Sequence, residues 1–429
     1  MAKHYPVIIV GGGQAGLSIS YCLKERGIQH IIFEKNRIGY AWRSKRWDSF
    51  CLVTPNWQCQ LPGYAYPGKD PHGFMKKDEI VTYIENYAAS FDPPVEEKVE
   101  VLKVCKSRNE DVFEVATSIG DYTADQVVIA AGSYHLPNIP RLAERLPKTV
   151  MQLHSSEYKT PELLPAQDVL VVGTGQSGCQ IAEDLHLAGK QVHLCVGGAP
   201  RSPRRYRGKD VVDWLDQMGY YDLSVDDHPQ KENVRTKANH YVTGRDGGRE
   251  IDLRQFALEG MKLYGRIKDV HVKDEQSGTL EFRNDLQQNL DQADAVSESI
   301  KKTIDQFIEK HQIEAPVEPP YCPVWQPEET LELDYTTIGA VIWCTGYRSD
   351  FKWIDIPVFD GKGYPGHERG VTSVRGLYFL GLPWLYTWGS GRFSGIARDA
   401  SYLADYIVAR KKVSPSNAWS VVNEFLLGS

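Results

Sequence analysis

Two glycine-rich segments, residues 11–16 and 173–178, share the pattern G-x-G-x-x-G. Each follows a short apolar run of strand length, at residues 7–10 and 169–172, and each precedes a stretch of helical character. A strand, a glycine turn and a helix in this order are typical of the turn that holds the phosphates of a dinucleotide. The repeat therefore predicts an α/β chain with two nucleotide-binding units.

Other segments continue the alternation of strands and helices. Two more apolar runs, at residues 127–131 and 340–344, lead into glycine in the same way. Helices are expected at residues 14–26, 78–90, 176–188 and 401–411. This order is typical of parallel sheets with helices on their faces. We therefore predict an α/β fold of two Rossmann-like dinucleotide-binding domains, with the second inserted into the first.

The chain length of 429 residues suits two or three domains. We predict the first part of one domain over residues 1–160, a second domain over 161–334, and the return of the first over 335–429. Residues 284–312 have apolar side chains at helical spacing and predict a helical insertion, either a lid over the first nucleotide or a homodimer contact. Residues 315–329 carry five prolines and predict a loop.

Each glycine of the first segment has a distinct expected role. Gly11 permits the tight turn, Gly13 lets the backbone approach a pyrophosphate, and Gly16 lets the helix pack closely on the strand. Glu34 ends the next expected strand, residues 30–33, where an acid accepts hydrogen bonds from ribose hydroxyls. The predicted residues of this site are Gly11, Gly13, Gln14, Ala15, Gly16, Glu34 and Lys35.

The second segment lacks an acid at the position equivalent to Glu34, where Val196 stands. A basic stretch, residues 201–209, follows instead. A guanidinium can bind a 2′-phosphate through two hydrogen bonds, whereas an acid would repel it, so we predict NADPH rather than NADH. A solvated basic loop and a nucleic-acid patch are the alternative interpretations of these cations. The predicted residues of this site are Gly173, Gly175, Gln176, Ser177, Gly178, Arg201, Arg204 and Arg205.

Charge and cysteine spacing disfavour several classes of protein. Lys plus Arg number 49 against 56 for Asp plus Glu, a net charge of −7, which disfavours nucleic-acid binding. No apolar run has the length of a membrane span, and the first glycine segment leaves no room for a cleavable signal, so we expect a soluble cytoplasmic protein. The eight cysteines include no C-x-x-C pair, which disfavours disulfide reduction and a zinc site.

Residues beyond the glycine segments resemble the flavin-containing monooxygenase family. Gly39 and Trp42 match a G-G-x-W segment of that family, with Tyr40 in place of its second glycine. Residues 340–347 are similar to its A-T-G-Y element, and residues 377–384 to its last strand on the flavin side. The resemblance adds five predicted cofactor-binding residues, which are Trp42, Thr345, Gly346, Tyr347 and Gly381.

The resemblance implies a monooxygenase that uses FAD and NADPH. Hydride would pass from NADPH to FAD, O₂ would add to the reduced flavin, and the peroxyflavin would insert one oxygen atom into a small organic substrate at nitrogen, sulfur or a carbonyl group. Asn56, in the loop that matches the family's flavin-contacting region, is the predicted catalytic hydrogen-bonding residue. Four aromatic residues either line the substrate side or pack in the core, namely Trp384, Tyr386, Trp388 and Phe393.

Two other functions fit the same residues. An NADPH oxidase or flavin reductase would use both nucleotides without inserting oxygen, because the lifetime of the oxygen adduct depends on packing that no motif encodes. A non-catalytic flavoprotein that senses NADPH would need only the two binding sites.

Overall fold

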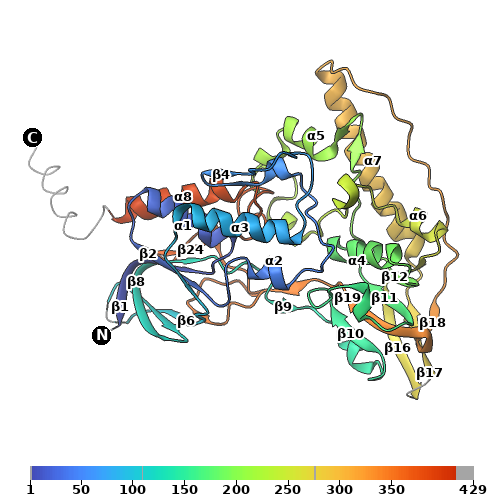
Figure 1. Ribbon diagram of the computed structural model, residues 1–429, viewed down its shortest axis with the longest axis horizontal. Helices are drawn as coiled ribbons and strands as arrows, with labels where there is room; N and C mark the ends of the chain where they lie inside the picture. The colour runs from blue at the N-terminus through green and yellow to red at the C-terminus, as the bar shows by residue number, and fades with distance from the viewer. Residues whose placement is uncertain (1, 109, 275–276, 412–429) are drawn as a thin grey trace, which may run out of the picture.

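The computed structural model describes residues 2–108, 110–274 and 277–411. Its two largest sheets form the centres of two units (Figure 1). At the centre of the first sheet, β1 (Lys3–Val10) pairs in parallel with β2 (His30–Glu34) and with β8 (Gly120–Ile129). β24 (Leu377–Phe379) pairs with the other edge of β8, also in parallel. The first sheet therefore joins residues from both ends of the chain.

The second sheet has the strand order β10-β19-β11-β12-β15, and all of its pairs are parallel. Its strands are β10 (Met151–His154), β11 (Asp168–Val172), β12 (Val192–Cys195), β15 (Lys262–Tyr264) and β19 (Ile338–Trp343). The central strands β11, β12 and β19 are almost entirely buried, as expected for a parallel sheet that is covered on both faces, whereas the edge strand β10 has two exposed residues.

The strand order shows where the second unit begins and ends. All strands of its sheet fall within residues 151–343, between β8 and β24 of the first sheet. The predicted boundaries after residue 160 and before residue 335 therefore shift outward. β19 pairs with both β10 and β11, so it belongs to the second unit and not to the returning part of the first.

Helices cover the sheets where the sequence predicts them. α1 (Gln14–Glu25), α3 (Lys77–Phe91) and α8 (Ile396–Lys411) lie together in the first unit and share one buried apolar cluster with its sheet. α4 (Gln176–Leu187) follows β11 in the second unit. α8 begins at Ile396 rather than at residue 401, because its first turn is buried in that cluster.

α7 (Leu286–Lys310) confirms the predicted helical insertion, and residues 315–329 form the predicted loop. The first half of α7 packs on the second unit, where Leu286 and Leu290 are buried. Its second half packs on α5 (Val211–Gln217). Figure 1 shows α7 at the opposite end of the molecule from α1 and α8, so it is not a lid over the first glycine turn.

Residues 218–243, which we call the cover segment, pack on the C-terminal part of the first unit. The Val225 N–H donates a hydrogen bond of 2.7 Å to the carbonyl of Tyr386. Val225 and Val234 are buried together with Trp384. The cover segment thus ties the second unit to the residues that precede α8.

Shorter elements complete the two units. The first sheet also contains β5 (Val95–Glu97), β6 (Val101–Lys106), β7 (Phe113–Thr117), β21 (Ile354–Asp355), β22 (His367–Glu368) and β23 (Val371–Thr372). A separate antiparallel sheet contains β16 (Ile267–Asp274), β17 (Ser277–Phe282) and β18 (Glu332–Asp334). Short helices are α2 (Tyr40–Ser44) and α6 (Leu253–Leu258). Among the described residues, no helix combines the length and the apolar character needed to cross a membrane.

Candidate functional site

The two glycine turns have the same geometry at their first position. Gly11 and Gly173 have positive φ angles of 107° and 105°. A Cβ on Gly11 would lie 2.6 Å from the carbonyl oxygen of Ala130, and a Cβ on Gly173 would lie 2.8 Å from that of Cys344. In each unit the end of a neighbouring strand passes so close that only glycine fits.

The last glycine of each turn is equally constrained. A Cβ on Gly16 would lie 1.9 Å from the carbonyl oxygen of Gly11. A Cβ on Gly178 would lie 1.8 Å from that of Gly173. Both glycines therefore let the first turn of a helix pack directly on the glycine turn, which agrees with the role predicted for them.

The middle glycine of each turn faces open space. A Cβ on Gly13 or Gly175 would meet no atom within 4 Å. Their φ angles are −77° and −63°, which any residue adopts, so the backbone itself does not require glycine. The missing side chain therefore serves a molecule that approaches the backbone, as a pyrophosphate does.

The N-termini of α1 and α4 have no side-chain cap. The carboxylates of Asp210 and Asp252, in contrast, cap α5 and α6 by accepting hydrogen bonds from backbone N–H groups. Free N–H groups at a helix N-terminus bind phosphate, and the helix dipole adds to the attraction. The residues present therefore fit a dinucleotide at each of the two turns.

Glu34 lies beside the first turn at the end of β2. Its Oε2 accepts a hydrogen bond of 2.6 Å from the Gly12 N–H, and its Oε1 accepts one of 2.8 Å from the Asn36 N–H. These bonds hold the carboxylate in place, and each oxygen keeps a lone pair for a ribose hydroxyl. Lys35 does not join this site, because its Nζ pairs with Glu100 at 2.6 Å on the surface.

Side chains from separate segments meet at the start of α1. Gln14 donates from Nε2 to the carbonyl of Gly391 at 3.0 Å and accepts at Oε1 from Trp42 Nε1 at 3.1 Å. The Trp42 ring stacks on Phe393, with ring centroids 5.6 Å apart. Gln14 thus ties α2 and the segment before α8 to the first turn.

The C-terminal segment passes over the start of α1 at Gly381. A Cβ on Gly381 would lie 2.7 Å from the Cβ of Ala15, and its φ angle is 84°. A Cβ on Gly391 would lie 2.5 Å from the Gly381 carbonyl oxygen. These contacts place Gly381 and Ala15 together at the first turn, and their role in cofactor binding stays a prediction.

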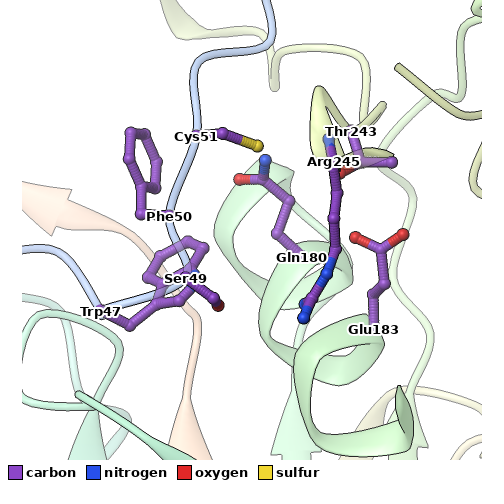
Figure 2. A pocket seen from close by; sticks show the side chains of 8 residues that line it. All are labelled: Trp47, Ser49, Phe50, Cys51, Gln180, Glu183, Thr243 and Arg245. Atoms are coloured by element: carbon purple, nitrogen blue, oxygen red, sulfur yellow. The ribbon is translucent and has the colours of Figure 1, made fainter. Parts of the chain in front are cut away.

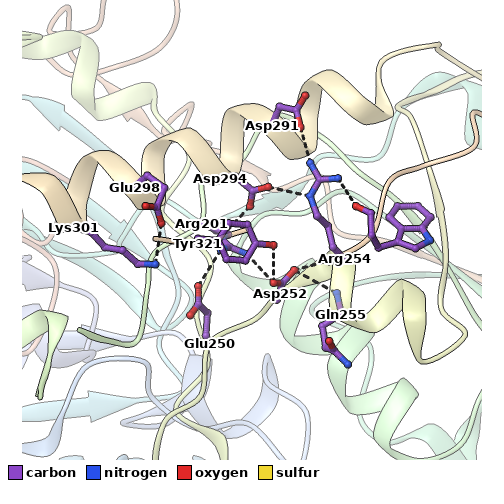
Figure 3. A network of polar contacts seen from close by, with 11 residues as sticks. Arg201, Glu250, Asp252, Arg254, Gln255, Asp291, Asp294, Glu298, Lys301 and Tyr321 are labelled. Carbon is purple, nitrogen blue, oxygen red and sulfur yellow. Dashed lines mark hydrogen bonds and ion pairs between the residues drawn. The ribbon is translucent and has the colours of Figure 1, made fainter. Parts of the chain in front are cut away.

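Arg201 is not available to a nucleotide. Its side chain is 2% exposed, and its guanidinium lies 3.2 to 3.3 Å from the carboxylates of Glu250, Asp252 and Asp294 (Figure 3). Burial would lower the pKa of Arg201, but the three carboxylates outweigh this effect and raise it. The role predicted for Arg201 at the 2′-phosphate is therefore wrong, because this residue neutralises a buried acidic cluster.

Arg204 is also internal, whereas Arg205 is exposed. Arg204 donates from Nη1 to the carbonyl of Val53 at 2.6 Å and from Nη2 to Asp210 at 2.5 Å. It therefore joins the two units and is not free to bind a phosphate, contrary to the prediction. The Arg205 guanidinium has one long hydrogen bond to the described residues, of 3.4 Å to the Gly247 carbonyl, and can meet a ligand.

Asn56 stabilises a loop. Its Nδ2 donates to the carbonyl of Asp70 at 3.0 Å, and its Oδ1 accepts from the Met75 N–H at 2.8 Å. The residue is 3% exposed. Because both ends of the buried amide bind the backbone of the same loop, the geometry contradicts the predicted catalytic role.

Residues 345–347 lie at the junction of the two units, beside the second turn. They follow Cys344, and Tyr347 belongs to β20 (Tyr347–Arg348), which pairs with β9 (Leu136–Pro137). The buried His154 donates from Nε2 to the carbonyl of Gly346 at 3.0 Å, since a carbonyl can only accept. Thr345, Gly346 and Tyr347 therefore connect the units, and their role in cofactor binding stays a prediction.

A polar contact around Asp184 of α4 also joins the units, and no sequence motif predicts it. Asp184 accepts hydrogen bonds from Ser49 at 2.6 Å, from Tyr158 at 2.6 Å and from Arg245 at 2.7 Å. Figure 2 shows Ser49 and Arg245 beside a cavity of about 10 Å³, which Cys51 also lines. The cavity has room for about one water molecule, so this contact is structural.

Six of the eight cysteines are buried, whereas Cys105 is partly exposed and Cys322 is exposed. All eight lie within the described residues, and all are free. Cys51 and Cys59 are buried, and burial raises the pKa of their thiols to about 11 and about 12. Such thiols are poor nucleophiles near neutral pH.

Comparison with known proteins identifies the family. The family model described as pyridine nucleotide-disulphide oxidoreductase matches residues 8–256, which include both glycine turns. The chain belongs to this family. A family relative, a CzcO-like oxidoreductase of Geobacillus kaustophilus, is 35% identical over 405 residues, which cover 94% of this chain and 98% of that protein. The protein is therefore an oxidoreductase.

Other relatives have a named reaction or a solved structure. YUCCA6 of Arabidopsis thaliana, named an indole-3-pyruvate monooxygenase, is 34% identical over 200 residues, which cover 45% of this chain and 48% of that protein. The structure of a flavin-containing monooxygenase from Stenotrophomonas maltophilia has a TM-score of 0.62 at 19% identity, covering 95% of this chain and 99% of that chain. This likeness confirms the α/β fold of flavoprotein oxidoreductases.

Proposed function

We propose that this oxidoreductase is a monooxygenase that binds FAD at the first glycine turn and NADPH at the second. The observation that carries the proposal is the pair of turns, which have the same backbone geometry but different neighbours. Glu34 stands beside the first, where it can bind the ribose of FAD. Val196 stands at the equivalent place beside the second, where no acid would repel a 2′-phosphate.

In this proposal the NADPH domain, residues 151–343, is inserted into the FAD domain. The bound nucleotides supply the redox chemistry, and the protein binds, orients and shields them. The N-termini of α1 and α4 bind the two pyrophosphates, and Gln14 and Trp42 hold the C-terminal segment over the first turn. Arg205 binds the 2′-phosphate, because its exposed guanidinium forms no ion pair with the described residues.

The cover segment keeps water from the place where the nucleotides react. Oxygen insertion needs such shielding, since a reactive oxygen species in contact with water decomposes before a substrate arrives. Support comes from the packing of Val225 and Val234 on Trp384. Two of the four candidate aromatic residues, Trp384 and Phe393, are in fact buried core residues, which leaves Tyr386 and Trp388 partly exposed.

Oxygen is favoured over a disulfide as the electron acceptor. The buried cysteines are unsuited to thiol exchange. YUCCA6 and the Stenotrophomonas maltophilia enzyme are both named as monooxygenases, whereas another protein of the same fold, from Staphylococcus aureus, is named a bacillithiol disulfide reductase. The fold therefore allows both acceptors, and the cysteines support oxygen.

The test uses isotopically labelled O₂ and three probes, which are methyl phenyl sulfide, dimethylaniline and phenylpyruvate, the last of which also carries a carboxylate. They offer a sulfur atom, a nitrogen atom and a carbonyl group. We expect NADPH consumption to be accompanied by a product of at least one probe that carries one labelled oxygen atom in its mass spectrum. If all labelled oxygen appears as hydrogen peroxide with every probe, the protein is an NADPH oxidase and oxygen insertion is refuted.

A further inference from the structure

Arg392, in the segment before α8, is a cation without an anionic partner among the described residues. Its Nη1 donates to the carbonyl of Trp388, and its Nη2 donates to Oδ1 of Asn239 at 2.8 Å. Its Nε forms no hydrogen bond to the described part of the chain. A guanidinium has five N–H donors, so most of those on Arg392 remain available to a ligand.

Arg201 provides a comparison within the same protein. Arg201 is buried and Arg392 is partly exposed, and desolvation disfavours the charged form of each. Three carboxylates compensate at Arg201 and raise its pKa, whereas the pKa of Arg392 is lowered and its titratable neighbours are Tyr134, Tyr220 and Tyr221. Burial raises the pKa of Tyr220 and Tyr221, which therefore supply no negative charge. A partly desolvated cation without a compensating charge is costly, and together with the free N–H donors of Arg392 this points to an anion that binds there.

The Arg392 guanidinium lies on one ring of an aromatic group formed by Trp388, Tyr221 and Tyr220. The Arg392 Cζ lies 3.9 Å from the ring centroid of Trp388. The ring of Tyr221, from the cover segment, lies 4.8 Å from Trp388, and the ring of Tyr220 lies 5.6 Å from Tyr221. A charge-binding group beside flat apolar surfaces suits a small molecule with an anionic end and an aromatic or apolar body.

The position of Arg392 separates it from the phosphate sites. Its neighbour Gly391 is bonded to Gln14, and its neighbour Phe393 stacks on Trp42, so Arg392 adjoins the first nucleotide turn. Its guanidinium turns the other way, toward Asn239 of the cover segment. The pyrophosphates have their own sites at the N-termini of α1 and α4. An anion that pairs with Arg392 would therefore lie between the first unit and the cover segment.

We propose that the substrate of this enzyme is an organic carboxylate whose anionic group pairs with Arg392 and whose body lies against Trp388 and Tyr221. This inference rests on the proposed function, since it assumes that the reaction takes place between the first unit and the cover segment. Arg392 is the specificity-determining residue, and Asn239 is a positioning residue that orients its guanidinium. A planar guanidinium suits a carboxylate because it can form two parallel hydrogen bonds with it.

The test compares the binding of phenylacetate and phenylacetamide, which have nearly the same shape and differ in charge. Calorimetric titration of the holoenzyme should show that phenylacetate binds about 10- to 100-fold more tightly, the usual range for a hydrogen-bonded charge. Arg392→Met should abolish this difference and leave the binding of phenylacetamide unchanged. Arg392→Lys should keep part of it, because lysine retains the charge but not the planar fork.

Arg398→Met is the matched control. Arg398 is exposed on α8 and pairs with Asp222 of the cover segment, so its loss removes the same charge nearby without touching the site. This variant should retain the preference for phenylacetate.

Equal binding of acid and amide by the unmodified enzyme would overturn the proposal, whether or not any variant folds. A preference that survives in Arg392→Met would also overturn it, as would loss of FAD or NADPH binding in Arg392→Met with the preference intact. Because the titration needs no turnover, it is independent of the oxygen-insertion assay. Failure of that assay alone would refute the monooxygenase activity and leave the carboxylate site in place.

Discussion

Replacing Gly175 with alanine should leave the stability of the fold nearly unchanged and weaken NADPH binding. The backbone of Gly175, with φ of −63° and ψ of 176°, is one that alanine adopts without strain, and a Cβ there meets no atom within 4 Å. A Gly-to-Ala change at such a position gains about 0.4–1 kcal/mol in free energy of unfolding, because the unfolded chain loses conformational freedom. Gly175 is also the N-cap residue of α4, where alanine is less favourable than glycine by a similar amount, so the two effects nearly cancel.

The same methyl group would occupy the space through which a pyrophosphate approaches the backbone. Loss of one hydrogen bond between a backbone N–H and a charged phosphate costs about 1.5–3 kcal/mol, which raises Kd about 10- to 150-fold. Gly13→Ala should have the equivalent effect on FAD at the first turn, where φ is −77° and no atom lies within 4 Å of the added Cβ.

Urea unfolding of the nucleotide-free protein measures the stability, and calorimetric titration with NADPH measures the affinity. Gly175→Ala should keep its FAD, and Gly13→Ala should keep its affinity for NADPH, because each change affects one turn. Gly178→Ala is the contrasting control, since its Cβ would lie 1.8 Å from the Gly173 carbonyl oxygen and should destabilise the second unit.

An unchanged Kd for NADPH in Gly175→Ala would refute the argument that the open space at the middle glycine belongs to a dinucleotide. A large loss of stability in the same variant would refute the reading of the backbone geometry.

Three further predictions concern charged residues. Arg201→Met should lower the free energy of unfolding by about 3–5 kcal/mol in urea unfolding, because Glu250, Asp252 and Asp294 lose their counter-charge. In steady-state kinetics the same variant should leave the KM for NADPH nearly unchanged. Arg205→Ala should raise the KM for NADPH and leave that for NADH unchanged, and equal effects on the two would remove Arg205 from the 2′-phosphate site. Burial raises the pKa of Asp399 from 3.8 to about 6, so the folded state binds the proton more tightly than the unfolded state does. This residue therefore destabilises the fold progressively as the pH rises from about 4 to 6. Urea unfolding should show that Asp399→Asn gains up to about 3 kcal/mol in free energy of unfolding relative to the unmodified protein over that range, and a pH-independent difference would contradict the assignment.

The parts of the fold that local backbone rules determine could be predicted from the sequence. The two turns are predictable because no residue other than glycine fits the close contacts at Gly11, Gly16, Gly173 and Gly178. The acid at Glu34 and the helices after each turn follow from the same repeated unit. α7 and the proline-rich loop were also predictable, since helical spacing and proline content are local properties.

The roles of individual polar side chains were not predictable, because their partners are distant in the chain. Arg201 and Arg204 belong to one basic stretch in the sequence, but the carboxylates that bind Arg201 come from residues 250–252 and from α7. Asn56 lies in the loop that matches the family's flavin-contacting region, yet its buried amide binds the backbone of residues 70 and 75. Charge density along the sequence does not show which cations the fold neutralises.

The central claim is that the two glycine turns hold two different nucleotides that react with each other. The most direct measurement is to mix the purified yellow protein with NADPH in the absence of oxygen and to follow the visible absorbance of its flavin. We predict that one equivalent of NADPH bleaches the flavin in the unmodified protein, and that Gly175→Ala needs a higher NADPH concentration to reach the same rate. A flavin that stays oxidised although NADPH is bound would contradict the account and favour a nucleotide-sensing protein.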